Sequence, residues 1–170
     1  MNISEDRKRA LEETYQYYFH NEKILKMKEI PAHRGSNTFI HTFKLVKAVM
    51  RKAIKSRKEI DLESLLLATI LHDYYLYDWR TNKNYVRPHG KTHPYVAIGN
   101  AKRDFGISDK VAKIMESHMW PLNFKKYPKG KEARIICLTD KDIAMIECLT
   151  SKKYKKRKEK YYLEKLSTLF

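Results

Sequence analysis

Apolar positions along the chain recur at the three- and four-residue spacing of amphipathic helices, and no run alternates with period two. Residues that can cap a helix precede several of these runs, and nearly all glycines and prolines fall between them. The expected helices run from Ser4 to about Met27, from Ser36 or Asn37 to about Ser56, from Asp61 to the doublet His72-Asp73, from His93-Pro94 to near Gly106, from Ser108 or Asp109 to His118, and from Glu132 to about Leu149. The pattern predicts an all-α bundle of about six to seven helices, counting a last helix over residues 161–170 docked on the body.

The length and composition fit one ordinary domain. Of the 170 residues, 42% are hydrophobic, which indicates a true core. We expect a single domain over residues 1–170, with its core at about 30–150 and with a basic segment (152–160) and the last helix packed on it. No apolar run approaches the roughly 20 residues that span a bilayer, and residues 1–13 lack the apolar region of a signal peptide. We therefore expect a cytoplasmic protein without a membrane segment.

The two cysteines agree with that expectation. Cys137 and Cys148 stand in one expected helix, about three turns apart, which is too far for a disulfide. Both are expected to be buried, unpaired thiols, as in a reducing compartment.

The charge of the chain predicts an anionic partner. The formal net charge is +16, and the segment KKYKKRKEK (152–160) holds seven basic side chains against one acidic. Such a balance attracts nucleotides, nucleic acid or phosphorylated metabolites. The basic segment could contact nucleic acid, with its interleaved tyrosine available for stacking, or it could be a solvated helix face.

Ionisable side chains stand on or beside the apolar faces of several expected helices. The run LLLATILHDYYLYDW ends an apolar helix in adjacent His72 and Asp73. Burying such groups is costly unless something pairs with them. His41, His118 and Asp140 lie on the apolar faces of three other helices, and His93 stands at a helix entrance.

A bound metal accounts for these positions jointly. Each histidine alone could be a hydrogen-bonded core residue, but a carboxylate such as Asp140 on an apolar face needs a partner. Imidazoles and carboxylates are the usual ligands of zinc, iron and manganese at partly open sites. The sequence thus favours a metal site formed by residues from separate helices.

The order His41, then His72-Asp73, then Asp140 resembles the H…HD…D signature of the HD-domain metal-dependent phosphohydrolase superfamily. The resemblance covers roughly residues 30–150 and implies an all-α, HD-domain-like helical bundle. It also implies that His41, His72, Asp73 and Asp140 hold a first divalent metal. Asp73 would bridge to a second, which His93 and His118 complete. The implied ions are two of Fe, Mn, Zn, Ni, Co or Mg.

The chain departs from one branch of this superfamily. The branch with the motif HD-x-G-K carries a lysine three residues after the aspartate, where Leu76 stands here. The segments HDYYLYDW, HGKTHPYVAIGNA and SHMWPL instead resemble a small stand-alone branch of uncharacterised HD proteins.

The resemblance implies hydrolysis of a phosphoester by a metal-activated water, with Asp73 as the central catalytic residue. The substrate would be a small phosphorylated anion, with a nucleotide favoured by the basic charge. His33, His89, Lys91 and Lys141 are the candidates to contact it. Two alternatives stay open: di-iron oxygenase chemistry, which some relatives perform with the same ligand set, and non-enzymatic nucleic-acid binding through residues 152–160.

Overall fold

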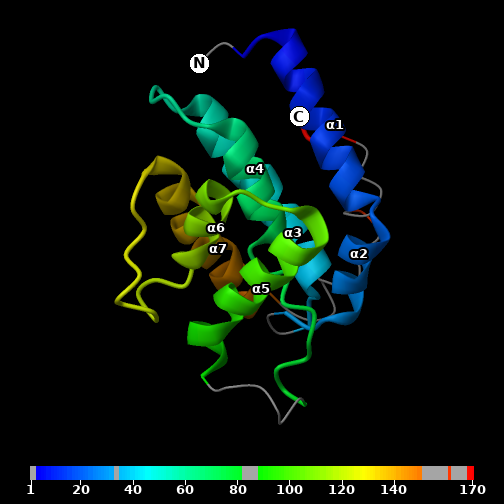
Figure 1. Ribbon diagram of the computed structural model, residues 1–170, viewed down its shortest axis with the longest axis vertical. Helices are drawn as coiled ribbons and strands as arrows, with labels where there is room; N and C mark the ends of the chain where they lie inside the picture. The colour runs from blue at the N-terminus through cyan, green and yellow to red at the C-terminus, as the bar shows by residue number, and fades with distance from the viewer. Residues whose placement is uncertain (1–2, 33–34, 82–87, 151–160, 162–167) are drawn as a thin grey trace.

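The computed structural model describes residues 3–32, 35–81, 88–150, 161 and 168–170, and these residues form helices and connecting loops without a β-strand (Figure 1). The elements are α1 (Glu5–Phe19), α2 (Glu22–Leu25), the 3-10 helix η1 (Lys26–Glu29), α3 (Thr38–Lys55), α4 (Leu62–Leu71), α5 (His89–Phe105), α6 (Asp109–Glu116) and α7 (Lys131–Leu149). The prediction of an all-α fold is confirmed.

Helices α3 and α4 pack against each other at the centre of the bundle. In Figure 1, α1 and α2 lie on one side of this pair, and α6 and α7 lie on the other. Helix α7 packs on α3 and α6 packs on α4, while α5 contacts both α4 and α6. None of the helices described combines the length and apolarity needed to cross a membrane.

The helix starts follow the capping chemistry that the sequence predicts. The side chains of Ser4, Asn37, Asp61 and Ser108 each accept a hydrogen bond from a backbone N–H in the first turn of α1, α3, α4 and α6, respectively. Such bonds satisfy donors that have no partner inside the helix. Gly106 ends α5 in the left-handed conformation, with φ of 61°, as expected for a C-terminal glycine.

The first expected helix is shorter than predicted. Helix α1 ends at Phe19, and the side chain of Asn21 accepts a hydrogen bond from the backbone N–H of Lys23 to begin α2. This break redirects the chain so that Ile24 and Met27 are buried. The expectation that one helix extends to about Met27 was wrong because a local cap overrides the continuous periodicity.

The fourth expected helix begins four residues earlier than predicted. Helix α5 starts at His89, and Pro94 lies inside it rather than at its first position. The Thr92 hydroxyl and the His93 ring donate hydrogen bonds to carbonyls at the start of this helix. These side-chain bonds support an additional turn before the proline.

Two further expectations concern single residues. Cys137 is buried and unpaired as predicted, but Cys148 is exposed, because it lies on the outer side of α7.

Leu169 is buried, and its backbone N–H donates to the carboxylate of Glu12 on α1. Most of the last expected helix and the basic segment 152–160 lie outside the described residues.

The apolar core fixes the two central helices. Phe39, Leu45 and Met50 of α3 and Leu65 and Leu66 of α4 are almost completely buried. A close-packed interior of this kind holds side chains in defined rotamers. The functional side chains on α3 and at the end of α4 therefore stand on rigid supports.

We expect Asp61→Ala to lower the free energy of unfolding by about 1 kcal/mol, because the variant loses the cap of α4. The Asp61 carboxylate also accepts from the ammonium of Lys110, and its pKa is held below the usual range by this pair and by Ser64, against the opposing effect of burial. Urea denaturation at neutral pH measures the loss. Glu13→Ala, at an exposed position in α1, is the control and should change stability by less than about 0.5 kcal/mol. Equal losses in the two variants would contradict the capping role.

Candidate metal centre

Six side chains that the sequence singled out converge where α4 ends. They are His41 on α3, His72 and Asp73 directly after α4, His93 on α5, His118 two residues after the end of α6, and Asp140 in the middle of α7. All the histidines are buried, Asp140 is 8% exposed, and the Asp73 side chain is 14% exposed. Four of the six, Asp73, His93, His118 and Asp140, line a cavity of about 100 Å³.

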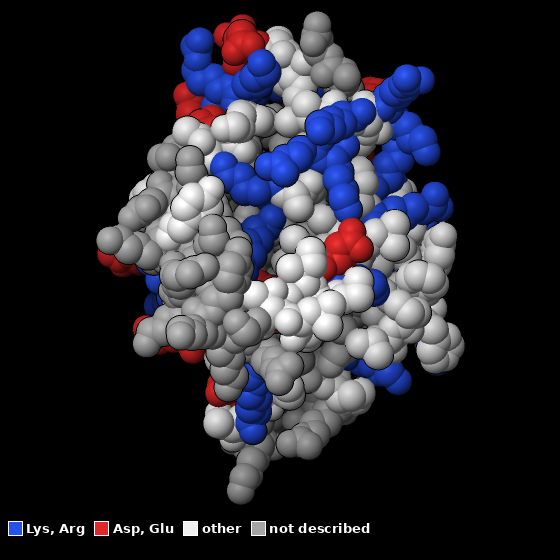
Figure 2. Space-filling model, turned by 180° about the vertical axis from the view of Figure 1, so that it is seen from behind, with Lys and Arg blue, Asp and Glu red and all other residues white. Residues whose placement is uncertain are grey.

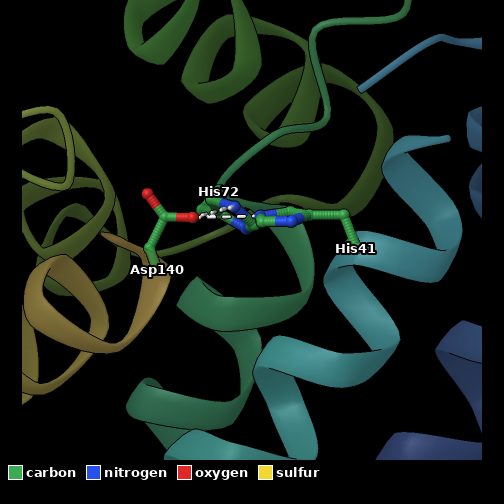
Figure 3. A group of neighbouring side chains, drawn as sticks. All are labelled: His41, His72 and Asp140. Carbon is green, nitrogen blue, oxygen red and sulfur yellow. Dashed lines mark hydrogen bonds and ion pairs between the residues drawn. The ribbon is translucent and has the colours of Figure 1, made fainter. Parts of the chain in front are cut away.

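His41, His72 and Asp140 form the first group. Their side chains point toward one another from three helical segments (Figure 3). His41 Nε2 lies 3.0 Å and His72 Nε2 lies 3.9 Å from the same carboxylate oxygen, Asp140 Oδ1. One atom from each of these residues could bind a single ion, since all three atoms lie within 4.8 Å of one another.

Asp73, His93 and His118 form the second group, within the same 4.8 Å limit. Asp73 Oδ1 lies 3.2 Å from His93 Nε2 and 3.6 Å from His118 Nε2. The two histidine nitrogens are 2.8 Å apart. All three residues of this group line the cavity, together with Asp140 of the first group.

Asp73 connects the two groups through its two oxygens. Oδ1 faces His93 and His118, and Oδ2 lies 3.4 Å from Nε2 of His72 in the first group. A carboxylate in this position can contribute one oxygen to each of two neighbouring ions. The geometry agrees with the bridging role that the family resemblance implies.

Backbone carbonyls fix the orientation of three of the rings. The Nδ1 atoms of His72, His93 and His118 lie 2.9, 3.0 and 2.7 Å from the carbonyl oxygens of Thr69, His89 and Met115. A carbonyl can only accept, so each Nδ1 carries a proton, and each ring when neutral directs an Nε2 lone pair at the other side chains of the centre.

Those lone pairs need a cation or a proton among them. Nε2 of His72 is buried without a hydrogen-bond partner. The close approach of His93 Nε2 to His118 Nε2 is repulsive unless a positive charge lies between the two atoms. The two groups together offer four imidazoles and two carboxylates, a donor set that fits divalent transition metals.

Glu147 is a functional candidate that sequence reasoning missed. It is 2% exposed, and its carboxylate lies 3.0 Å from His41 Nδ1 and 2.8 Å from Lys44 Nζ. The signal was available, because Glu147 follows Asp140 by two helical turns and so lies on the same face of α7. A carboxylate behind a histidine fixes the ring and makes it a more basic metal ligand.

The pKa values of His41 and His72 are shifted in opposite directions. Burial lowers the pKa of His41, but the hydrogen bonds that its ring donates to Asp140 and Glu147 outweigh this effect and raise the pKa to about 10. Burial lowers the pKa of His72 to about 4, so this ring is neutral at physiological pH. The pKa of Asp73 lies well below its usual value despite burial, because His72, His118 and His93 surround it.

Of the candidate substrate-contacting residues, His89 lines the cavity. Its ring stacks between Trp79 and His93, and its Nδ1 lies 2.9 Å from the hydroxyl of Tyr77. Burial and the neighbouring His93 lower the pKa of His89 to about 4. This ring therefore adds a neutral polar group to the wall of the cavity.

The other three candidates are placed differently. Lys141 lies behind the cavity, where its ammonium donates to the backbone carbonyls of His118 and Cys137. Lys91 is exposed and is not among the described residues that line the cavity. His33 lies outside the described residues.

Comparison with known proteins gives one match. Residues 38–145 match the family model of the HD domain, a region that includes all six converging residues. No curated protein and no solved structure matches the chain. The match covers more than half of the sequence and includes the residues of the two candidate metal-binding groups. The chain belongs to the HD domain family, whose members are generally metal-dependent hydrolases.

Proposed function

We propose that the protein hydrolyses a phosphoester of a small anionic substrate at a centre of two divalent ions. His41, His72, Asp73 and Asp140 would hold one ion, and Asp73, His93 and His118 would hold the other. The observation that carries this proposal is the set of lone pairs directed at one another around Asp73, including the unpartnered Nε2 of His72. When bound, such ions supply a hydroxide nucleophile near neutral pH and neutralise phosphoryl charge.

The size of the cavity limits what can enter it. Its volume of about 100 Å³ is far below the roughly 300–1,000 Å³ of pockets that enclose a whole drug-sized ligand. A phosphoryl group fits, while the remainder of the substrate stays at the rim, where Trp79 is 40% exposed. We therefore favour a terminal phosphomonoester, with nucleotides as the first substrates to test because the chain is strongly basic.

His89 is placed to contact the phosphoryl group. If the Tyr77 hydroxyl donates to Nδ1, the neutral ring carries its proton on Nε2 and can donate from there. The low pKa of His89 keeps the ring neutral, so it serves as a hydrogen-bond donor rather than a fixed positive charge. Asp73 and Asp140 orient the rings around the cavity, and the buried wall of Tyr75 limits entry of water.

Asp73→Ala should lose at least one metal ion per chain and reduce turnover by more than about 100-fold, because both groups share this carboxylate. Metal analysis of the purified protein and phosphate release from a panel of nucleotides and other phosphomonoesters measure the two effects. Asp109→Ala, an exposed carboxylate on α6, is the control. The proposal fails if the wild-type protein holds no metal and gains none on soaking with Mn²⁺, Fe²⁺ or Zn²⁺. Oxygen consumption by the iron-loaded protein, without phosphate release, would favour oxygenase chemistry instead.

Metal affinity should increase with pH from 6 to 8. In the metal-free protein His41 has a pKa of about 10 and is protonated, so an ion at its Nε2 must displace that proton. Displacement of one proton makes binding about tenfold tighter per pH unit below the pKa. Titration calorimetry with Mn²⁺ at several pH values, in buffers of different ionisation enthalpy, counts the protons released. A pH-independent affinity would show that His41 is not a ligand.

Glu147→Gln should weaken metal binding by roughly 10- to 100-fold, because His41 loses a charged hydrogen-bond partner. The same Mn²⁺ titration measures it, and Glu147→Asp should restore part of the affinity. Glu132→Gln is the matched control on α7, because Glu132 lies in the first turn and bonds the backbone of Asp61. Equal effects of the two substitutions on metal affinity would exclude a specific role for Glu147.

A further inference from the structure

A second concave surface lies along α3. It is a groove of about 740 Å³ between α3, α7 and residues near the end of the described chain. We call it the α3 groove; its lining residues are Phe43, Lys44, Lys47, Ala48, Met50, Arg51, Ile54, Lys55, Ile143, Tyr161, Thr168, Leu169 and Phe170. It shares no described lining residue with the cavity of the metal centre.

One wall of the α3 groove is a row of cations. Lys44, Lys47, Arg51 and Lys55 follow one another at spacings of three, four and four residues, which places them along one side of α3. The row spans about 16 Å at the helical rise of 1.5 Å per residue. Figure 2, which looks at the molecule from behind, shows lysine and arginine side chains gathered in a band across this face. No acidic residue is among the described lining residues.

The remainder of the groove is apolar and partly aromatic. Met50, Ile54, Ile143 and Leu169 supply aliphatic surface beside the cations. Tyr161 is 46% exposed and Phe170 is 48% exposed, although both are large hydrophobic side chains. Exposed aromatic rings next to a basic row can stack on flat groups of a bound anion.

The row of cations is longer than a single phosphate requires. One phosphate group would contact one or two neighbouring cations, whereas a row of about 16 Å can follow several consecutive phosphates, which are 3.4 Å apart per strand along a duplex. Proteins that bind single strands combine a basic groove for the backbone with aromatic side chains on which bases stack. The α3 groove contains both parts, and the net charge of +16 adds a long-range attraction to polyanions.

We infer that the α3 groove binds single-stranded nucleic acid. The phosphates lie along Lys44, Lys47, Arg51 and Lys55, and the bases contact Tyr161 and Phe170. Binding requires no metal, because the groove is separate from the metal-ligand groups. The assignment goes beyond phosphoester hydrolysis, and failure of one leaves the other intact.

The test is fluorescence anisotropy with the full chain and a labelled 12-nucleotide oligothymidylate, in EDTA and over a range of salt concentrations. The variant Arg51→Gln/Lys55→Gln should bind roughly tenfold or more weakly, and its plot of log affinity against log salt should be flatter by about 1.4. The matched control is Lys113→Gln/Lys125→Gln, which removes the same charge from exposed positions on other segments. Its affinity should change less than about threefold. Thermal unfolding checks that both variants are folded.

A second variant separates nucleic acid from a simple polyanion. Phe170→Ala should weaken oligothymidylate binding by about tenfold, because a stacking contact is lost. It should leave the affinity for inorganic polyphosphate unchanged. Equal effects of Phe170→Ala on the two ligands, or none on either, would overturn the nucleic-acid assignment.

Three other outcomes would also overturn it. The wild-type protein could fail to bind oligothymidylate. The Lys113/Lys125 control could lose as much affinity as the groove variant, which would indicate attraction by net charge alone. Finally, Lys155→Gln/Lys156→Gln, in the basic segment 152–160, could abolish binding while the groove variant retains it.

Discussion

The site depends on three hydrogen bonds that histidine Nδ1 atoms donate to main-chain carbonyls. Thr69, His89 and Met115 accept these protons, and each lies close to the histidine that it fixes because helical turns bring them together. The rings therefore cannot rotate to donate into the cavity without losing a buried hydrogen bond. The bundle thus brings lone pairs and carboxylates together in one buried centre, an arrangement that is stable only when positive charge lies among them.

Much of the fold and most of the side chains that converge where α4 ends were predictable because their signals are local. Serine, asparagine and aspartate caps mark where helices start, and the apolar face of α3 places His41 inside. The doublet His72-Asp73 could be recognised in the sequence because ionisable residues at the end of an apolar helix are rare. The six side chains lie on or just after five helices, and their pairing was accessible only through the order of the family signature.

The remainder depends on long-range packing. Glu147 lies on the same face of α7 as Asp140, but only the packing of α7 on α3 brings its carboxylate to His41. The start of α5 depends on side-chain bonds from Thr92 and His93 that periodicity does not encode. The positions of Lys91 and Lys141 relative to the cavity likewise follow from tertiary structure.

Lys44 has a consequence for the protein as a whole. Its ammonium lines the α3 groove and also bonds Glu147, which in turn bonds His41. An anion in the groove that attracts Lys44 would weaken the ion pair between Lys44 and Glu147. The Glu147 carboxylate would then interact more strongly with His41. Thermodynamic linkage makes such coupling reciprocal, so metal loading would alter affinity in the groove by the same factor. Binding at one of these two surfaces would then change the affinity at the other through α3, without any change of fold.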